Sequence, residues 1–350
     1  MSIVKFSDVA HRANTKEDRF NTDKIYYVGG EHIVSNELFV ISKGIIKGST
    51  IGPMFYCGFT SGQILFVTRN PHLRKCGIVD FDGICSEKTF VIESKDTTKL
   101  SQEYLAIIMQ SDEFWNYCEE NKSGGVNYFL NWSTLADYEF ELPPIQIQEE
   151  ITEKVMSAYR LKQSYQKLLT ATDEMVKSQF IEMFGNVKDT RSLCEICRPK
   201  QWPTIPTKDF TEDGYLVYGA NGVIGHYSEF NHEYPTILMA CRGASCGAIN
   251  ISQPNSYITG NAMCMDEIIP EVSFEYLAYF LSNYDYKTII TGGAQPQITY
   301  TNLKKVMVPI PPYSEQLNFA LIYQQADKSK FELRKSIEAI DAVIKNLING

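Results

Sequence analysis

The sequence lacks several features that would place a protein in a special class. Its apolar runs fall short of the ~18 residues that a membrane span needs, and its first residues, MSIVKFSDVAHR, lack the apolar core of a secretory signal. The net charge is −9, from 33 basic and 42 acidic residues, so the chain is not coated in positive charge. We therefore expect a cytoplasmic protein with no membrane partner, and charge alone indicates no nucleic-acid partner.

Ligand and cofactor motifs are also scarce. Cys194 and Cys197 form a C-x-x-C without a second pair at zinc-ribbon spacing, and the five histidines show no ligand spacing. The nine cysteines are an odd number, which favours reduced thiols. The segment Gly219–Gly225 lacks the Lys-Ser/Thr of a phosphate-binding loop, and Asn221-Gly222 within it predicts a hairpin with a primed turn. We predict no metal, no cofactor and no catalytic residue in this chain.

What the sequence does contain is an internal repeat at a constant offset of 168, the difference between Gly124 and Gly292. The offset also relates Leu135 to Leu303 and Gln148 to Gln316. The pairs Gly124-Gly125 and Pro143-Pro144 recur as Gly292-Gly293 and Pro311-Pro312. Two helices of similar composition would explain shared lysines, but they would not explain the shared glycine pair, leucine, proline pair and glutamine. The chain therefore contains two copies of one structural unit.

A long helical pattern follows each Pro-Pro. Apolar residues recur at steps of four and three, the heptad spacing of a coiled coil, over about 30 residues in each copy. We predict that the two helices pack antiparallel along a seam, with Lys162 and Lys330 at one shared seam position. The apolar seam residues are Ile151, Val155, Tyr165, Leu169 and Val176 in the first helix and Phe319, Tyr323, Leu333, Ile337 and Ile344 in the second.

Two globular regions with mixed helix and strand patterns precede these helices. Strands are expected over 63–68, 76–81 and 89–93 and a helix over 102–118. In the second region we expect strands over 215–218, 223–227 and 236–241 and a helix over 274–283. The predicted fold class is α+β, with two mixed α/β domains separated by two long antiparallel helices that form a coiled coil in a pseudo-two-fold repeat. The predicted segments are 1–142, 143–185, 186–312 and 313–350.

Basic and amide side chains concentrate in loops at matching places of the two regions. Arg69 and Arg242 each follow an apolar strand, where arginine can read guanine or clamp a phosphate. A solvated turn is an equally good interpretation of either residue alone. The Gly-Gly loops bring amides and backbone close to a nucleic-acid backbone. The candidate DNA-binding residues are Arg69, Arg74, Lys75, Lys122 and Asn127 in the first region and Asn221, Arg242, Ser245, Gln295 and Gln297 in the second.

Two other functions remain open on the sequence. Asp80, Glu93 and Lys95 have the outline of a metal-dependent nuclease site, if the two carboxylates lie at the ends of adjacent strands. A coiled-coil scaffold without DNA binding is the other alternative. Metal-dependent cleavage by the chain alone would favour the nuclease, and an adenine methyltransferase gene beside this one would argue against both alternatives.

The order of these motifs resembles the specificity subunits of type I restriction–modification systems. The likeness rests on the two Gly-Gly to Pro-Pro boundaries, on Phe180–Gly185 at the end of the first helix, and on Tyr218–Gly225 and Arg242–Gly247. The resemblance implies two target recognition domains that each read half of a split site in double-stranded DNA. It implies that two methyltransferase subunits dock on the helices, that these subunits bind S-adenosylmethionine, and that motor-nuclease restriction subunits join for cleavage.

Overall fold

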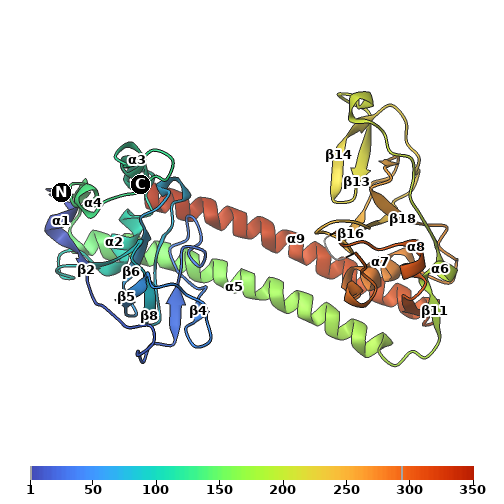
Figure 1. Ribbon diagram of the computed structural model, residues 1–350, viewed down its shortest axis with the longest axis horizontal. Coiled ribbons are helices and arrows are strands. Elements are labelled where there is room, and N and C mark those ends of the chain that lie inside the picture. The colour runs from blue at the N-terminus through green and yellow to red at the C-terminus, as the bar shows by residue number, and fades with distance from the viewer. Residues whose placement is uncertain (1, 293–294) are drawn as a thin grey trace. The chain divides into compact units, whose positions relative to one another are not determined.

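The computed structural model describes residues 2–292 and 295–350 (Figure 1). The chain forms two compact units. The first unit comprises residues 2–167 and 333–350, and the second comprises residues 168–332. Each unit therefore contains one globular region and a part of both long helices.

The first unit is built on two four-stranded sheets. One sheet has the order β2-β9-β6-β7 with antiparallel neighbours, and the other has the order β4-β3-β8-β5 with a parallel β3–β8 pair. A two-stranded sheet joins β1 (Ser2–Lys5) to β10 (Glu139–Leu142). The remaining strands are β2 (Ala10–Ala13), β3 (Tyr26–Val28), β4 (Gly44–Ile45), β5 (Phe55–Phe59), β6 (Ile64–Val67), β7 (Cys76–Ile78), β8 (Gly83–Ser86) and β9 (Thr89–Ser94).

The helix expected over 102–118 is divided into α2 (Gln102–Ile108) and α3 (Asp112–Glu120). The reason is local, because Ser111 caps α3 by accepting a hydrogen bond from the backbone N–H of Phe114. The apolar core below these helices contains Phe66 and Trp115, whose rings stack with centroids 5.5 Å apart. The short helices of this unit are α1 (Phe6–Val9) and α4 (Trp132–Ala136).

The second unit has a four-stranded sheet in the order β12-β18-β15-β16 and a three-stranded sheet in the order β14-β13-β17. Helix α7 (Phe274–Asn283) contributes Tyr276 and Leu277 to the core. The strands are β11 (Thr190–Ser192), β12 (Arg198–Lys200), β13 (Tyr215–Gly219), β14 (Gly222–Tyr227), β15 (Ile237–Ala240), β16 (Ile249–Ile251), β17 (Tyr257–Ile258), β18 (Ala262–Asp266) and β19 (Met307–Pro309), and the short helices are α6 (Leu193–Ile196) and α8 (Tyr300–Leu303).

The predicted hairpin forms between β13 and β14, but its turn differs from the prediction. Gly219 pairs with Gly222, so the two turn residues are Ala220 and Asn221. Both keep negative φ, whereas a primed turn requires positive φ at its centre. Gly222 supplies the positive φ instead, at 117°, a conformation that is cheap for glycine.

The two predicted long helices are α5 (Ile145–Phe184) and α9 (Tyr313–Asn349). Each begins directly after a Pro-Pro pair, and α5 ends before Gly185. With 40 and 37 residues they are longer than the expected 30, because the heptad positions that indicated them run only from Ile151 to Val176 and from Phe319 to Ile344. None of the helices in the described part of the chain combines the length and the hydropathy that a membrane crossing requires.

All ten predicted seam residues lie at least half-buried, and Val155, Val176, Phe319 and Ile344 are fully buried. In the first unit Val155, near the start of α5, shares a core cluster with Ile344, near the end of α9. In the second unit Val176 shares one with Phe319. The helices are therefore antiparallel within each unit, as predicted. A supercoiled geometry and the division into four segments stay predictions of the sequence.

Candidate nucleic-acid interface

The structure joins the two kinds of loop that the sequence analysis singled out. In the first unit, the turn at Arg69 bonds to the Gly-Gly loop: Asn70 donates its backbone N–H to the carbonyl of Tyr128 at 3.0 Å, and Leu130 donates to Thr68 at 2.9 Å. Ser123 and Phe129 close the Gly-Gly loop with two backbone hydrogen bonds of 2.9 Å. We call residues 68–70 and 122–130 the first loop pair.

The second unit repeats the same hydrogen bonds. Gly243 donates its backbone N–H to the carbonyl of Pro296 and Ile298 donates to Cys241, both at 3.0 Å, and Thr291 and Gln297 close the loop. We call the described residues of 241–245 and 291–298 the second loop pair; Gly293 and Ala294 of the predicted Gly-Gly loop lie outside the described residues. Since the offset is 168 for the Gly-Gly loops but 173 between Arg69 and Arg242, no single alignment offset predicts this joining.

The Gly-Gly loops need their first glycine for a steric reason. Gly124 and Gly292 have φ values of 96° and 86°. A Cβ atom on Gly124 would lie 2.7 Å from the carbonyl oxygen of Asn127, and one on Gly292 would lie 2.4 Å from that of Gln295. The close turn presents the loop tip to solvent, where Val126 is 94% exposed. Val126 was missed by the sequence analysis, although an apolar residue between Gly125 and Asn127 in a polar loop was a usable signal.

In the first loop pair, the basic side chains already have partners. The guanidinium of Arg69 lies over the ring of Phe129, 5.1 Å from its centroid. Lys122 forms an ion pair of 2.7 Å with Glu119 and lies 4.5 Å from the centre of the Tyr128 ring. Asn127 is exposed. Together these side chains form a surface of aromatic faces, amides and cations, the composition that contacts bases and phosphates.

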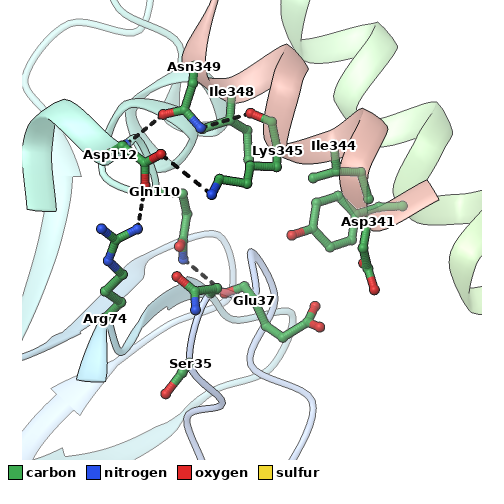
Figure 2. A pocket seen from close by; sticks show the side chains of 12 residues that line it. Ser35, Glu37, Arg74, Gln110, Asp112, Asp341, Ile344, Lys345, Ile348 and Asn349 are labelled. Carbon is green, nitrogen blue, oxygen red and sulfur yellow. Dashed lines mark hydrogen bonds and ion pairs between the residues drawn. The ribbon is translucent and has the colours of Figure 1, made fainter. Parts of the chain in front are cut away.

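Arg74 and Lys75 lie outside the first loop pair. Arg74 pairs with Asp112 at the start of α3, and the ammonium group of Lys345 in α9 lies 3.8 Å from the same carboxylate. The carboxamide oxygen of Asn349 accepts a hydrogen bond of 2.6 Å from the Asp112 backbone. Figure 2 shows these side chains around a pocket of about 380 Å³. Lys75 donates to the carbonyl of Gly30.

Two carboxylates of the first unit have lowered pKa values. The hydrogen bond from Arg74 lowers the pKa of Asp112. The pKa of Glu87 is lowered by hydrogen bonds from Lys88 and Tyr56, with a smaller contribution from the charge of Arg69. The interaction between Arg74 and Asp112 ties the chain after the Arg69 turn to α3 and α9, so Arg74 has a positioning role here.

In the second loop pair, the predicted side chains are free of ionic partners. Arg242, Gln295 and Gln297 are exposed and Ser245 is half-buried. Within residues 2–292 and 295–350, Arg242 forms no ion pair. Asn221 is also exposed but belongs to the β13–β14 turn, not to the loop pair. Arg242 is therefore the predicted residue best placed to contact an external anion or base.

An equivalent buried glutamine fixes each globular region, and with it each loop pair, to a long helix. Gln148 is fully buried; it accepts from the backbone of Ser101 at 3.0 Å and donates to the carbonyls of Lys99 and Pro143. Gln316, also fully buried, accepts from Ser273 at 2.8 Å and donates to Glu271 and Pro311. Ser101 and Ser273 cap α2 and α7, so the glutamine holds the first turn of each helix.

The nuclease geometry does not form, which corrects that alternative. The sheet order places β6 between β7, which precedes Asp80, and β9, which carries Glu93. Strands two apart are separated by about 10 Å, so Asp80 and Glu93 do not lie at the ends of adjacent strands as the nuclease alternative required. Glu93 instead accepts a 2.7 Å hydrogen bond from Gln63, and Lys95 donates to the carbonyl of Ser7.

One group of three possible metal ligands comes together among the described residues, although their spacing in the chain matches no metal-binding motif. The donor atoms of His232, Cys264 and Asp266 lie within 4.8 Å of one another. Asp266 is already engaged, since it pairs with the His232 ring at 3.1 Å and accepts from the Trp202 ring N–H at 2.9 Å. Burial raises the pKa of the Cys264 thiol. A hydrogen-bonded histidine–aspartate pair accounts for this cluster.

Comparison with known families gives a consistent result. Residues 2–169 and 186–341 match the family described as type I restriction modification DNA specificity domain. The chain is 23% identical over 113 residues to the type I restriction enzyme EcoprrI specificity subunit of Escherichia coli, and 28% identical over 109 residues to the EcoDI specificity subunit of the same organism. These stretches are 32% and 31% of this chain and span 28% and 24% of the relatives.

Solved structures share the fold. The S subunit of the type I restriction–modification system from M. genitalium matches with a TM-score of 0.62 at 13% identity, over 99% of this chain and 94% of that one. A chain from a study of complex assembly and conformational transition of the type I R-M system matches with a TM-score of 0.61 at 17% identity, over 100% of this chain and 97% of that one. The predicted α+β fold class is confirmed.

Proposed function

The chain belongs to the type I restriction modification DNA specificity domain family, and from this premise we propose that it is a non-catalytic subunit that reads a bipartite site in double-stranded DNA. The observation that carries the proposal is the duplicated loop pair, one in each compact unit, with matching backbone hydrogen bonds. Two similar frames with different side chains suit the reading of two different half-sites. Residues 1–142 and 186–312 would be the two target recognition domains.

The side chains of the loop pairs suit DNA more than a protein scaffold. An exposed arginine such as Arg242 binds guanine O6 and N7 or a phosphate. Exposed amides such as Asn127 and Gln295 pair with adenine edges, and an exposed valine such as Val126 contacts a thymine methyl group. The net charge of −9 is unfavourable for phosphate contact, so partner subunits would supply part of it.

We also propose that two methyltransferase subunits dock on the long helices and that restriction subunits join them. Large apolar residues recur along α5 at multiples of seven positions and remain 41–52% exposed: Ile147, Leu161, Leu168 and Met175. This stripe lies outside the seam and has the spacing that a partner helix uses. S-adenosylmethionine would be bound by the methyltransferase subunits, so this chain needs no cofactor, and the complex would act in the cytoplasm.

The test is a comparison of arginine variants in the complete complex. We expect Arg242→Ala to weaken recognition of one half-site by about 1–3 kcal/mol if Arg242 reads a base, and Arg69→Ala to affect the other half-site. Methylated sites, sequenced from cells that carry each variant complex, would report the two half-sites separately. Arg198→Ala is the matched control, because it removes an exposed arginine that lies outside both loop pairs and outside the long helices.

Two outcomes would contradict the proposal, and a third would only reassign Arg242 from base to phosphate. Loss of specificity at both half-sites with either variant would show that the loop pairs do not divide the site between them. An Arg242→Ala complex that binds every sequence more weakly, with a reduced salt dependence, would assign Arg242 to phosphate. A complex that binds DNA no better than the methyltransferase alone would favour a scaffold without DNA binding. We expect the chain alone neither to cut nor to methylate DNA.

A further inference from the structure

Two cysteines of the first unit face each other across neighbouring strands. Cys57 in β5 is paired in antiparallel register with Cys85 in β8, directly after a register shift between Phe55 and Cys57. Side chains of directly opposed residues point to the same face of a sheet, and the Cα atoms of such pairs are about 4.5–5.5 Å apart. That separation falls within the range of about 4.4–6.8 Å that a disulfide bridges. Both thiols are free in the structure.

The surroundings of Cys57 favour the reactive thiolate. Cys85 donates a hydrogen bond to the Cys57 sulfur, which lowers the pKa of Cys57 to about 7 even though burial acts in the opposite direction. The guanidinium of Arg12 favours the thiolate as well, while Glu87 opposes it weakly. Cys57 is half-buried, and a bridge to Lys16 covers its strand on the side away from β8. The same hydrogen bond, together with burial, raises the pKa of Cys85, which therefore keeps its proton.

A second thiol pair in the same unit shows the contrast. Cys76 and Cys118 are both buried in the main core of the unit. Burial contributes most to the raised pKa of each thiol. Among the described residues, no cationic side chain lowers either pKa. Thiols of this kind are inert structural residues. The chain thus carries its own reference pair for a measurement of thiol reactivity.

We propose that Cys57 and Cys85 form a redox modification site, in which a peroxide oxidises Cys57 and Cys85 resolves the product as a disulfide. The Cys57 thiolate attacks one oxygen of hydrogen peroxide, forms sulfenic acid and releases hydroxide. Cys85 then attacks the sulfenic sulfur; the S–S bond forms, the S–O bond breaks, and water leaves with the Cys85 proton. The two thiols lose two electrons and the peroxide gains them. The inference does not depend on DNA reading.

The first measurement uses the full-length reduced chain under native conditions. We expect iodoacetamide to label Cys57 roughly tenfold or more faster than Cys118. Treatment with hydrogen peroxide, followed by peptide mapping without reductant, should give a linked peptide that contains Cys57 and Cys85. Equal labelling rates for Cys57 and Cys118, or a peroxide product that lacks this linkage, would overturn the proposal.

Two serine variants separate the roles of the pair. Cys85→Ser removes the resolving thiol, so sulfenic acid should persist on Cys57 and be trapped by dimedone. Cys118→Ser is the matched control and should leave both the labelling of Cys57 and the disulfide unchanged. If Cys85→Ser fails to fold, judged by circular dichroism, the measurements on the unaltered chain decide alone. In Cys57→Ser, Cys85 should no longer enter a disulfide. If Cys85 still forms a disulfide with another cysteine at the same rate, the proposed pairing is refuted.

Discussion

The two loop pairs have the same backbone hydrogen-bond pattern, but they differ in whether their basic side chains have partners within the chain. In the first, Arg69 lies over Phe129 and Lys122 pairs with Glu119. In the second, Arg242 projects into solvent without an ionic partner among the described residues. The backbone hydrogen bonds that hold the two frames are nevertheless the same. The repeat therefore preserves the frame while the side chains on it vary, which is how one fold can present two different recognition surfaces.

The long helices show the same relation between a shared frame and local differences. Lys162 pairs with Asp341 at 2.8 Å in the first unit, and Lys330 pairs with Asp173 at 2.8 Å in the second. The offset of 168 relates Lys162 to Lys330 and Asp173 to Asp341, so the pairing is reciprocal. Lys162 has an additional partner, Glu37. This reciprocity supports the predicted internal repeat and shows where the copies diverge.

The largest effect should come from the buried glutamines, where the two units are most alike. Gln148→Leu would leave a backbone N–H and two carbonyls without their partners, and Gln316→Leu would do the same in the second unit. We expect each to reduce the free energy of unfolding by about 2–4 kcal/mol. Urea unfolding gives the size of the loss, and hydrogen exchange read by mass spectrometry locates it to one unit.

Gln163→Leu is a suitable control for these variants, since Gln163 is a half-buried glutamine of α5 and its replacement should change the stability by about 0.5 kcal/mol or less. Losses that differ by more than about 2 kcal/mol between Gln148→Leu and Gln316→Leu would break the equivalence of the two units.

The seam lysines should produce a smaller and unequal effect. Lys162→Met removes the cationic partner of both Asp341 and Glu37, whereas Lys330→Met removes chiefly the cationic partner of Asp173. We expect losses of about 1–3 kcal/mol for Lys162→Met and about 1 kcal/mol or less for Lys330→Met. Thermal unfolding of the two variants side by side measures the difference. Equal losses would mean that Glu37 adds nothing to the first unit.

The contribution of Lys162 should also depend on pH. Burial alone would lower its pKa, but hydrogen bonds and charges from Asp341 and Glu37 outweigh burial and raise it above 10.5. A raised pKa in the folded state means that the stabilisation is fully present below the unfolded value of 10.5 and is lost as the pH rises through the folded pKa. The stability difference between the unaltered chain and Lys162→Met should therefore be constant near pH 8 and shrink at strongly alkaline pH.

An effect about as small as that of Lys330→Met is expected at the middle of the seam. Leu169 and Ile337 are only half-buried, unlike the fully buried Val155 and Ile344 near the globular regions. We expect Leu169→Ala and Ile337→Ala to cost about 1 kcal/mol each, below the about 2–5 kcal/mol typical of a fully buried side chain. Urea unfolding measures the loss in the free energy of unfolding. A loss of about 2–5 kcal/mol would show that this segment is more tightly packed than expected.

Local patterns in the sequence determined the elements that repeat over long distances. The Pro-Pro pairs and heptad positions predicted both long helices, because a helix start and a seam are encoded by residues close together in the chain. The Gly-Gly loops were predictable for a similar reason, since Gly124 requires a positive φ that other residues rarely adopt. Splitting of the helix over 102–118 was not predicted, because the cap at Ser111 competes with an otherwise helical pattern.

Only the tertiary structure decided which polar side chains are available. The sequence placed Arg69, Arg74 and Arg242 in the same class, yet Arg74 is held by Asp112 and Arg242 has no such partner. Asp80 and Glu93 were expected on adjacent strands, and the insertion of β6 between β7 and β9 separated them. Cys57 and Cys85 became neighbours through strand register alone. Ion pairs, strand order and register join residues far apart in the chain, so their geometry depends on the folded arrangement and leaves no local signal in the sequence.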